Sequence, residues 1–133
     1  MVNINKEKIK EIAEEHRLKL VVLFGSQATG HTHKKSDVDV GYVANRGIDY
    51  RENYDISMKL APLFKNPDIE LVNLYNVSPE FKKQVADEGV VLYESNSMIF
   101  DLYKIQAFKM HVENKPLRDL RHASLKNFIA SHV

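Results

Sequence analysis

Cysteine is absent from this chain of 133 residues. The protein can therefore form no disulfide, no thiolate nucleophile and no cysteine-bound metal site. Hydrophobic residues nevertheless make up 44% of the sequence, which is enough for a buried core and argues against disorder. The length is typical of one domain, so we expect a single domain over residues 1–133.

The chain also lacks long apolar runs and a dominant charge. No run approaches the roughly 20 apolar residues that span a bilayer, and the charged N-terminus lacks the apolar region of a signal peptide. The 19 basic and 18 acidic side chains give a formal net charge of +1, which provides no overall attraction to nucleic acid or membranes. We expect a cytoplasmic protein that binds neither directly, and any affinity for phosphate must come from a local arrangement.

Helical and strand patterns alternate along the sequence. We expect helices over residues 5–16, 50–65, 79–89 and 99–113, and strands over residues 18–24, 37–43, 69–74 and 90–93. Pro116 interrupts a C-terminal helical tail that covers residues 97–133. This order is typical of an α/β (α+β) domain in which helices flank a small mixed sheet of about four strands.

The stretch "LFGSQATGHTHKKSDVDVGYV" places two acids, Asp37 and Asp39, at the start of a strand. Side chains alternate along a strand, so both carboxylates point to the same face and repel each other. A cation between them relieves the repulsion, as does a proton on one of them. Mg²⁺ is a suitable cation because it takes one or two carboxylates together with water and phosphate oxygens. Two solvent-facing acids on an exposed strand remain the alternative.

Gly25 and Ser26 lie between the first strand and a polar loop. Glycine lets the backbone turn sharply and lets a ligand approach closely, although Gly-Ser pairs also mark ordinary turns. If Ser26 begins a helical turn, its N–H groups and hydroxyl can hold phosphate oxygens. A phosphate site beside a metal site is the arrangement that phosphoryl or nucleotidyl transfer requires.

Glu70 is an acid within the apolar third strand, "DIELVNL". A neighbouring strand position could bring it beside Asp37 and Asp39, where it could accept a proton from an attacking hydroxyl. The alternative is an ordinary surface acid on an edge strand.

These residues together resemble a known family. Gly25-Ser26, ten residues and then Asp37-Val38-Asp39 match the GS-x10-D-x-D signature of the nucleotidyltransferase superfamily, and "IELVNL" resembles its downstream strand. The length of the chain is similar to that of minimal nucleotidyltransferases (MNT). The resemblance implies a fold like the core of DNA polymerase beta, with Gly25 and Ser26 binding the triphosphate of ATP. It also implies catalytic Asp37, Asp39 and Glu70 that bind two Mg²⁺ ions, for which Mn²⁺ can substitute.

The resemblance further implies a function and a partner. Many MNT proteins are antitoxins that transfer AMP from ATP to a tyrosine of a HEPN ribonuclease toxin, which predicts a protein adenylyltransferase in a homo- or hetero-oligomer. One alternative is an antitoxin that neutralises its toxin by binding alone. The other is an adenylyltransferase for a small molecule. The short chain argues against this alternative, because it shows no added domain that could form an acceptor pocket.

The helix over residues 99–113 has more apolar residues than one inward face can bury. These residues are Ile99, Phe100, Leu102, Tyr103, Ile105, Phe108 and Met110. We expect an exposed apolar patch that binds a protein partner or a second copy, unless residues 117–133 fold back over it.

Overall fold

The computed structural model describes residues 4–25, 38–65 and 68–131. Its helices are α1 (Lys6–Glu15), α3 (Tyr50–Phe64), α4 (Pro79–Glu88), α5 (Ile99–Glu113) and α6 (Lys115–Ser131). Its strands are β1 (Leu18–Phe24), β2 (Val38–Ala44), β3 (Ile69–Asn73) and β4 (Val90–Glu94). The expected elements are confirmed within one or two residues, except that the loop expected after Gly25 lies outside the described residues.

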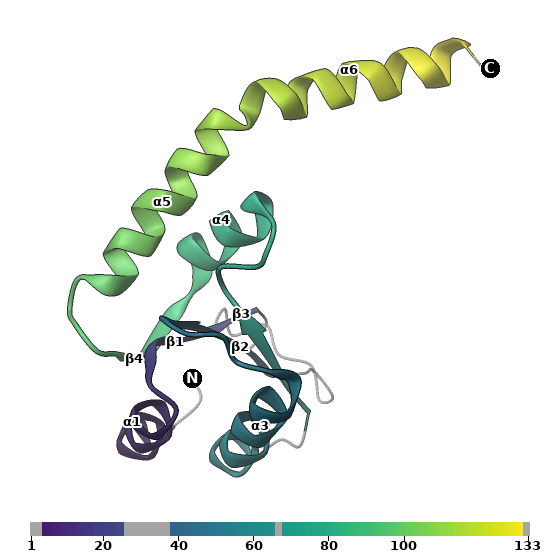
Figure 1. The fold of residues 1–133 in the computed structure, drawn as a ribbon. Coiled ribbons are helices and arrows are strands. Elements are labelled where there is room, and N and C mark those ends of the chain that lie inside the picture. The colour runs from purple at the N-terminus through teal and green to yellow at the C-terminus, as the bar shows by residue number, and fades with distance from the viewer. Residues whose placement is uncertain (1–3, 26–37, 66–67, 132–133) are drawn as a thin grey trace.

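The strands form one mixed sheet in the order β3-β2-β1-β4 (Figure 1). β1 runs antiparallel to both β2 and β4, whereas β2 and β3 are parallel. A parallel pair needs a crossover connection, and α3 lies in the connection between β2 and β3. The mixed sheet predicted from the sequence is therefore confirmed.

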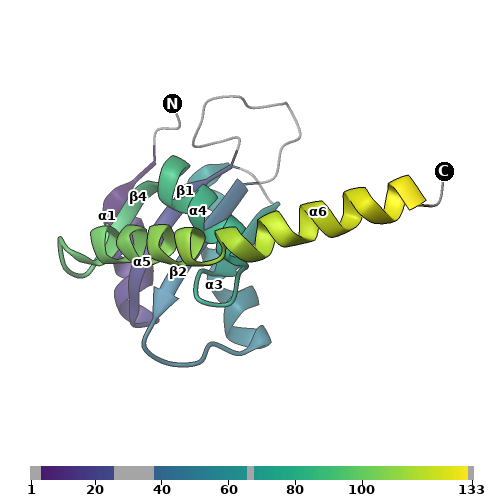
Figure 2. The same ribbon diagram turned by 90° about the horizontal axis from the view of Figure 1, so that it is seen from above.

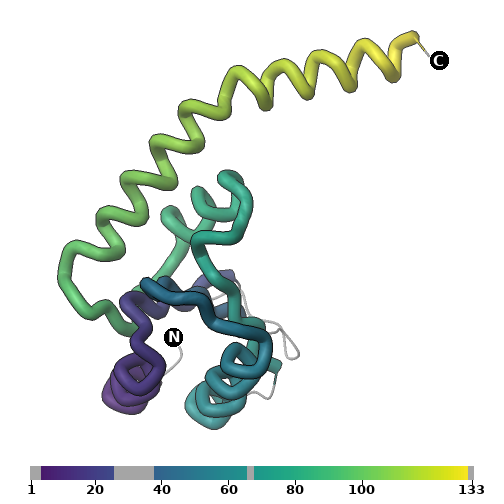
Figure 3. The backbone as a smooth tube through the Cα atoms, in the orientation of Figure 1, coloured from purple at the N-terminus to yellow at the C-terminus, as the bar shows by residue number. Residues whose placement is uncertain are grey.

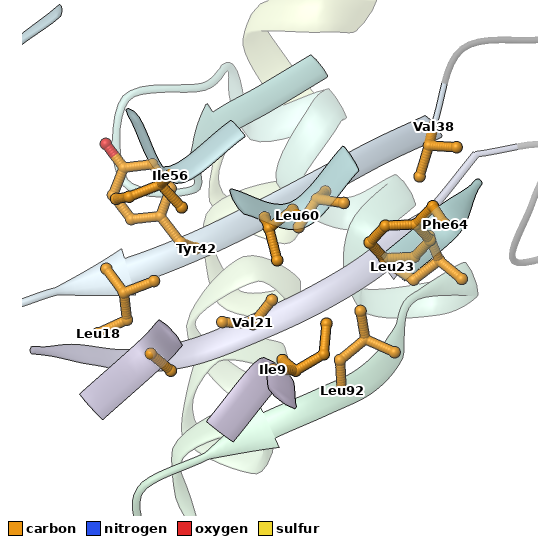
Figure 4. Close-up of a cluster of buried hydrophobic side chains, with 12 residues drawn as sticks. Ile9, Leu18, Val21, Leu23, Val38, Tyr42, Ile56, Leu60, Phe64 and Leu92 are labelled. Carbon is orange, nitrogen blue, oxygen red and sulfur yellow. The ribbon is translucent and has the colours of Figure 1, made fainter. Parts of the chain in front are cut away.

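Helices cover both faces of this sheet. Figure 1 shows α1 and α3 on one face and α4 and α5 on the other. On the first face, side chains of β1 and β2 pack against the inner sides of α1 and α3 (Figure 4). This core contains Ile9, Leu18, Val21, Leu23, Val38, Val40, Tyr42, Ile56, Leu60 and Phe64. The core on the opposite face contains Leu20, Val22, Phe24, Val43, Leu74, Val85, Phe100 and Tyr103.

Side chains at the helix starts fix where the helices begin. Asn5 Oδ1 accepts hydrogen bonds from the backbone of α1, and Asp49 and Ser78 cap α3 and α4 in the same way. Such caps satisfy N–H groups that have no partner within the helix. Pro79 follows Ser78 at the first helical position, where its missing N–H costs nothing.

α5 and α6 extend from the sheet as a long helical arm. The views of the chain show α6 projecting beyond α4, with its C-terminal end away from the sheet (Figures 1, 2 and 3). Pro116 is the second residue of α6, a position that proline tolerates, so it lies at the start of a new helix. No residue of α6 is buried. The alternative in which residues 117–133 fold back over α5 is therefore wrong.

Apolar side chains remain exposed on both helices of the arm. They are Leu102, Ile105, Phe108, Val112, Leu117, Leu120, Leu125, Phe128 and Ile129. α5 buries Phe100, Tyr103 and Ala107 on its inner side, so it is apolar on two opposite sides. The exposed apolar patch predicted from the sequence is present on the outer side of α5 and on α6. None of the described helices has the length and apolar character needed to cross a membrane.

Candidate active site

Three neighbouring strands bring Gly25, Asp39 and Glu70 into a row. In the antiparallel pair, Phe24 lies opposite Asp39, and Gly25 directly follows Phe24. In the parallel pair, Asp39 lies opposite Glu70. The row therefore runs across the sheet from the end of β1, through the start of β2, to the start of β3.

Strand alternation decides which face of the sheet carries the two acids. Val38 and Val40, on either side of Asp39, are buried in the core under α1 and α3. Asp39 therefore points to the opposite face, on which Phe24 packs beneath α4 and α5. Asp39 is half-buried and Glu70 is exposed, so the two carboxylates lie at a boundary between core and solvent.

Gly25 is required beside Asp39 for two reasons. Its φ of +78° is a conformation that residues with a Cβ rarely adopt. A Cβ at this position would also lie 2.3 Å from Asp39 Oδ2, which is far inside contact distance. The backbone of Gly25 therefore approaches the Asp39 carboxylate as closely as a glycine allows, and any larger residue would displace that carboxylate.

A cavity of about 140 Å³ opens beside this row. Besides Phe24, Gly25, Asp39 and Glu70, it is lined by Val72, Phe81 and Gln84. The ring of Phe81 packs edge-on against that of Phe24, with centroids 5.3 Å apart, and forms an apolar wall opposite the acids. The site thus combines two acids, a close backbone approach and an apolar surface.

The structure unites Gly25, Asp39 and Glu70, three of the residues singled out in the sequence. Ser26 and Asp37 lie outside the described residues. Within residues 4–25, 38–65 and 68–131, no three His, Cys, Asp or Glu side chains are grouped as metal ligands. The two carboxylates at the site are nevertheless hard oxygen donors on adjacent strands, which is the donor chemistry that suits Mg²⁺.

Sequence reasoning missed the wall that α4 contributes. Phe81 and Gln84 lie in the first turns of this helix, after its Ser78 cap. Their spacing of three residues places them on one helix face, which was the available signal. That this face meets the start of β2 depends on how α4 packs on the sheet, and the local sequence does not encode it.

A second polar cluster lies at the opposite end of the sheet. His16 precedes β1 and Arg46 follows β2, and both contact Glu52 of α3. Glu52 accepts hydrogen bonds from Arg46 Nη1 at 2.8 Å, from Arg46 Nη2, and at 2.9 Å from His16 Nδ1 when that nitrogen is protonated. Arg46 Nη2 also donates to the backbone oxygen of His16 at 2.7 Å. The Arg46 guanidinium and then His16 lower the pKa of Glu52 from 4.5 to about 2.

Comparison with known families finds a match over most of the chain. The family described as Polymerase beta, Nucleotidyltransferase matches residues 7–98, which include all of the described site residues. The chain belongs to this nucleotidyltransferase family. The resemblance noted in the sequence and the polymerase beta-like fold that it implied are both confirmed.

Relatives within the nucleotidyltransferase family are similar over most of the chain. The protein adenylyltransferase MntA of Aphanizomenon flos-aquae (strain 2012/KM1/D3) is 32% identical over 121 residues, covering 84% of this chain and 81% of the relative. A toxin–antitoxin crystal structure with AMP-PNP contains a chain that is 26% identical, with a TM-score of 0.75 over 95% of this chain and 99% of that chain.

A further structure shares the nucleotidyltransferase fold. It is described as a tri-AMPylated Shewanella oneidensis HEPN toxin in complex with MNT antitoxin. The likeness has a TM-score of 0.68 and 23% identity, and it covers 93% of this chain and 95% of that chain. At this identity the likeness is one of fold.

Proposed function

We propose that this nucleotidyltransferase is a cytoplasmic antitoxin that transfers AMP from ATP to a tyrosine hydroxyl of a HEPN ribonuclease toxin. The observation that carries the proposal is the row of Gly25, Asp39 and Glu70 beside one cavity. This row contains, in order, a close backbone approach, a half-buried acid and an exposed acid. The adenylyltransferase activity named for the MntA relative and the AMP-PNP in the similar structure support ATP as the nucleotide.

Each residue in the row has a distinct role in this proposal. Gly25 and the neighbouring Ser26 would bind the triphosphate, and Asp37, Asp39 and Glu70 would hold two Mg²⁺ ions, for which Mn²⁺ can substitute. When bound, the metal supplies a positive charge that offsets the charge of the transferring phosphate. Glu70 accepts the proton of the tyrosine hydroxyl. The tyrosine oxygen forms a bond to the α-phosphorus, and the bond between that phosphorus and the pyrophosphate oxygen breaks.

The exposed apolar side chains of the arm formed by α5 and α6 are evidence for a protein partner. α5 is apolar on two opposite sides, and a helix of this kind is normally covered on both. Large exposed apolar patches mark interaction sites. The complex of an MNT antitoxin with a HEPN toxin contains a chain with the same fold as this one. A HEPN toxin is therefore the class of partner that we propose for this chain.

Transfer can be tested with ATP that carries the label on its α-phosphate. The chain is incubated with this ATP, Mg²⁺ and a candidate HEPN toxin from the same organism, and the products are examined by mass spectrometry. We expect label and an added AMP mass on a HEPN tyrosine, and no label when the γ-phosphate carries it instead. An unlabelled HEPN protein that still forms a complex with the chain would overturn the transfer proposal.

Neutralisation by binding alone is the second candidate, and the exposed apolar arm is the observation that favours it. The variant Asp37→Asn/Asp39→Asn separates the two, because it removes two carboxylates and leaves the arm intact. Under the transfer proposal, this variant binds the toxin but no longer protects cells from it. Full protection by the variant would favour neutralisation by binding.

A further inference from the structure

A second cavity lies next to the site, and Glu70 lines both. It has a volume of about 310 Å³ and lies between α3 and β3. We call it the α3–β3 groove and define it by Tyr50, Asn53, Tyr54, Ser57 and Met58 of α3 and by Ile69, Glu70 and Leu71 of β3. Glu70 is the one residue that lines both this groove and the cavity beside Asp39.

We propose that the α3–β3 groove binds the segment of the acceptor protein that carries the receiving tyrosine. This inference rests on the proposed function and adds where the acceptor binds. The occupant of the groove is an extended protein segment. The order of the strands, the surface of the groove and the backbone of β3 support this choice.

Strand order separates the nucleotide side of the site from the acceptor side. The row begins at Gly25 on β1, passes Asp39 on β2 and ends at Glu70 on β3. β3 is the outer strand of the described sheet, and the α3–β3 groove lies beyond it. With the triphosphate at Gly25 and the proton acceptor at Glu70, an acceptor hydroxyl can approach across β3 without passing the nucleotide.

The surface of the groove is typical of a protein-binding site. Tyr50 is 90% exposed, Tyr54 61% and Met58 55%, although they belong to a helix whose other side is buried in the core. Tyrosine and methionine are enriched at protein interfaces, where tyrosine supplies contact area and hydrogen bonds at a low entropic cost. Their place beside Glu70 makes the groove continuous with the site at which transfer is proposed.

The outer edge of β3 has the backbone geometry that an extended segment needs. Val38 N–H donates to Asp68 O at 2.9 Å, and Leu74 N–H donates to Tyr42 O at 3.0 Å, so these positions of the β3 segment face β2. Positions alternate along a strand, and the backbone groups of Leu71 therefore face outward. Leu71 O accepts a long hydrogen bond of 3.4 Å from Asn53 Nδ2. An edge of this kind can pair with a strand of another protein.

Tyrosine substitutions at the groove test the proposal through the acceptor KM. Tyr50→Ala/Tyr54→Ala removes two exposed rings from the groove. Glu11→Ala is the control, because Glu11 is exposed on α1 and lines neither the groove nor the cavity beside the arm. With a HEPN toxin as acceptor, we expect the groove variant to raise the KM for that protein about tenfold. The KM for ATP should stay within about twofold of wild type, because the groove lies beyond the nucleotide side.

A cross-link gives a second readout that needs no transfer. Photoreactive p-benzoylphenylalanine in place of Tyr54 should capture the HEPN protein, and the same residue in place of Glu11, which is exposed on α1, should not. Equal capture from both positions, or equal acceptor KM values for the groove variant and the control, would overturn the proposal. If the wild-type chain transfers no AMP, the proposed function fails, and capture through position 54 alone still supports a partner in the groove.

Discussion

The two ends of the central sheet use acidic residues in opposite ways. At the end formed by Arg46 and His16, Glu52 is held by two partners from different segments, and its pKa falls to about 2. At the other end, Asp39 and Glu70 face each other across parallel strands. Among the described residues, Glu70 forms no ion pair with a basic side chain, and it borders two cavities.

This difference separates an acid whose contacts join three segments of the fold from acids that border a cavity. Glu52 joins α3 to the segments before β1 and after β2, so its charge is neutralised within the protein. Two carboxylates on adjacent strands repel each other unless a proton or an external cation compensates. Substitutions at the two ends should therefore affect different properties, activity at the end with Asp39 and Glu70 and stability at the end with Glu52.

The largest effect on activity is expected from Asp39→Asn. It removes the central charge of the row while keeping the shape of the side chain, and we expect AMP transfer to fall by about 10³-fold. The chain should stay folded, and the free energy of unfolding should change far less than the transfer rate, because Asn keeps the volume of the Asp side chain. Transfer of labelled AMP and urea unfolding measure the two quantities.

Asp87→Asn is the matched control, since Asp87 is an exposed acid of α4 that pairs with Lys83 and does not line the cavity. It should leave transfer unchanged. Wild-type transfer by the Asp39→Asn chain would show that the row is not the catalytic site.

Glu70→Gln should have the next largest effect. We expect transfer to slow by about 10²-fold, at the lower end of the range for a lost general base, because water can reach this exposed position. The thermal shift caused by Mg²⁺ and ATP should persist, since Asp39 is retained. Glu88→Gln changes another exposed glutamate and serves as control. Equal rates for Glu70→Gln and the control would make Glu70 an ordinary strand acid.

At the opposite end, Glu52→Ala should change stability and leave activity intact. Hydrogen bonds to charged groups contribute about 1–3 kcal/mol, and we expect a loss of this size in the free energy of unfolding. Urea denaturation measures it, and Glu11→Ala, at an exposed position on α1, provides the control. If transfer by the folded variant also fell tenfold, Glu52 would affect activity as well as stability. The proposal that the two ends of the sheet act independently would then be wrong.

The smallest effect concerns acid stability. The pKa of Glu52 is lower in the folded protein than its ordinary value of 4.5, so its contribution is complete above about pH 4.5. The contribution disappears as the pH falls through the folded-state value of about 2. In Glu52→Gln, the free energy of unfolding should therefore decrease less steeply over this window, by under about 1 kcal/mol per pH unit. Identical slopes for variant and wild type would contradict this role of Glu52.

The sequence predicted the end with Asp39 and Glu70 better than the end with Glu52, because the signals for the first end are short-range. Gly25 ends an apolar strand, and Asp39 begins the next one, so their spacing alone indicated a site. The pairing of Asp39 with Glu70 required only that β2 and β3 be neighbours, as α/β connections favour. The roles of Ser26 and Asp37 stay predictions.

The contacts of Glu52 could not be predicted in this way. His16 lies 36 positions before it, and the contact exists only once α1, β1 and α3 have packed. The groove beside Tyr54 has the same origin, because it forms between a helix and a strand that meet across the sheet edge. The interruption expected at Pro116 is present, since α5 ends at Glu113 and α6 begins at Lys115, but the direction in which α6 continues could not be predicted from the local pattern.

The lack of buried residues in α6 has a consequence for hydrogen exchange. Helix nucleation is costly, and a helix of 17 residues without tertiary burial is only marginally stable by its own propensity. Its amide hydrogens should therefore exchange through local unfolding, much faster than those of β1 at the centre of the sheet. A partner that binds α6 would bind a segment that unfolds locally. The entropy cost of ordering this segment would reduce the free energy of binding. Protection of these amides on complex formation would then report assembly directly.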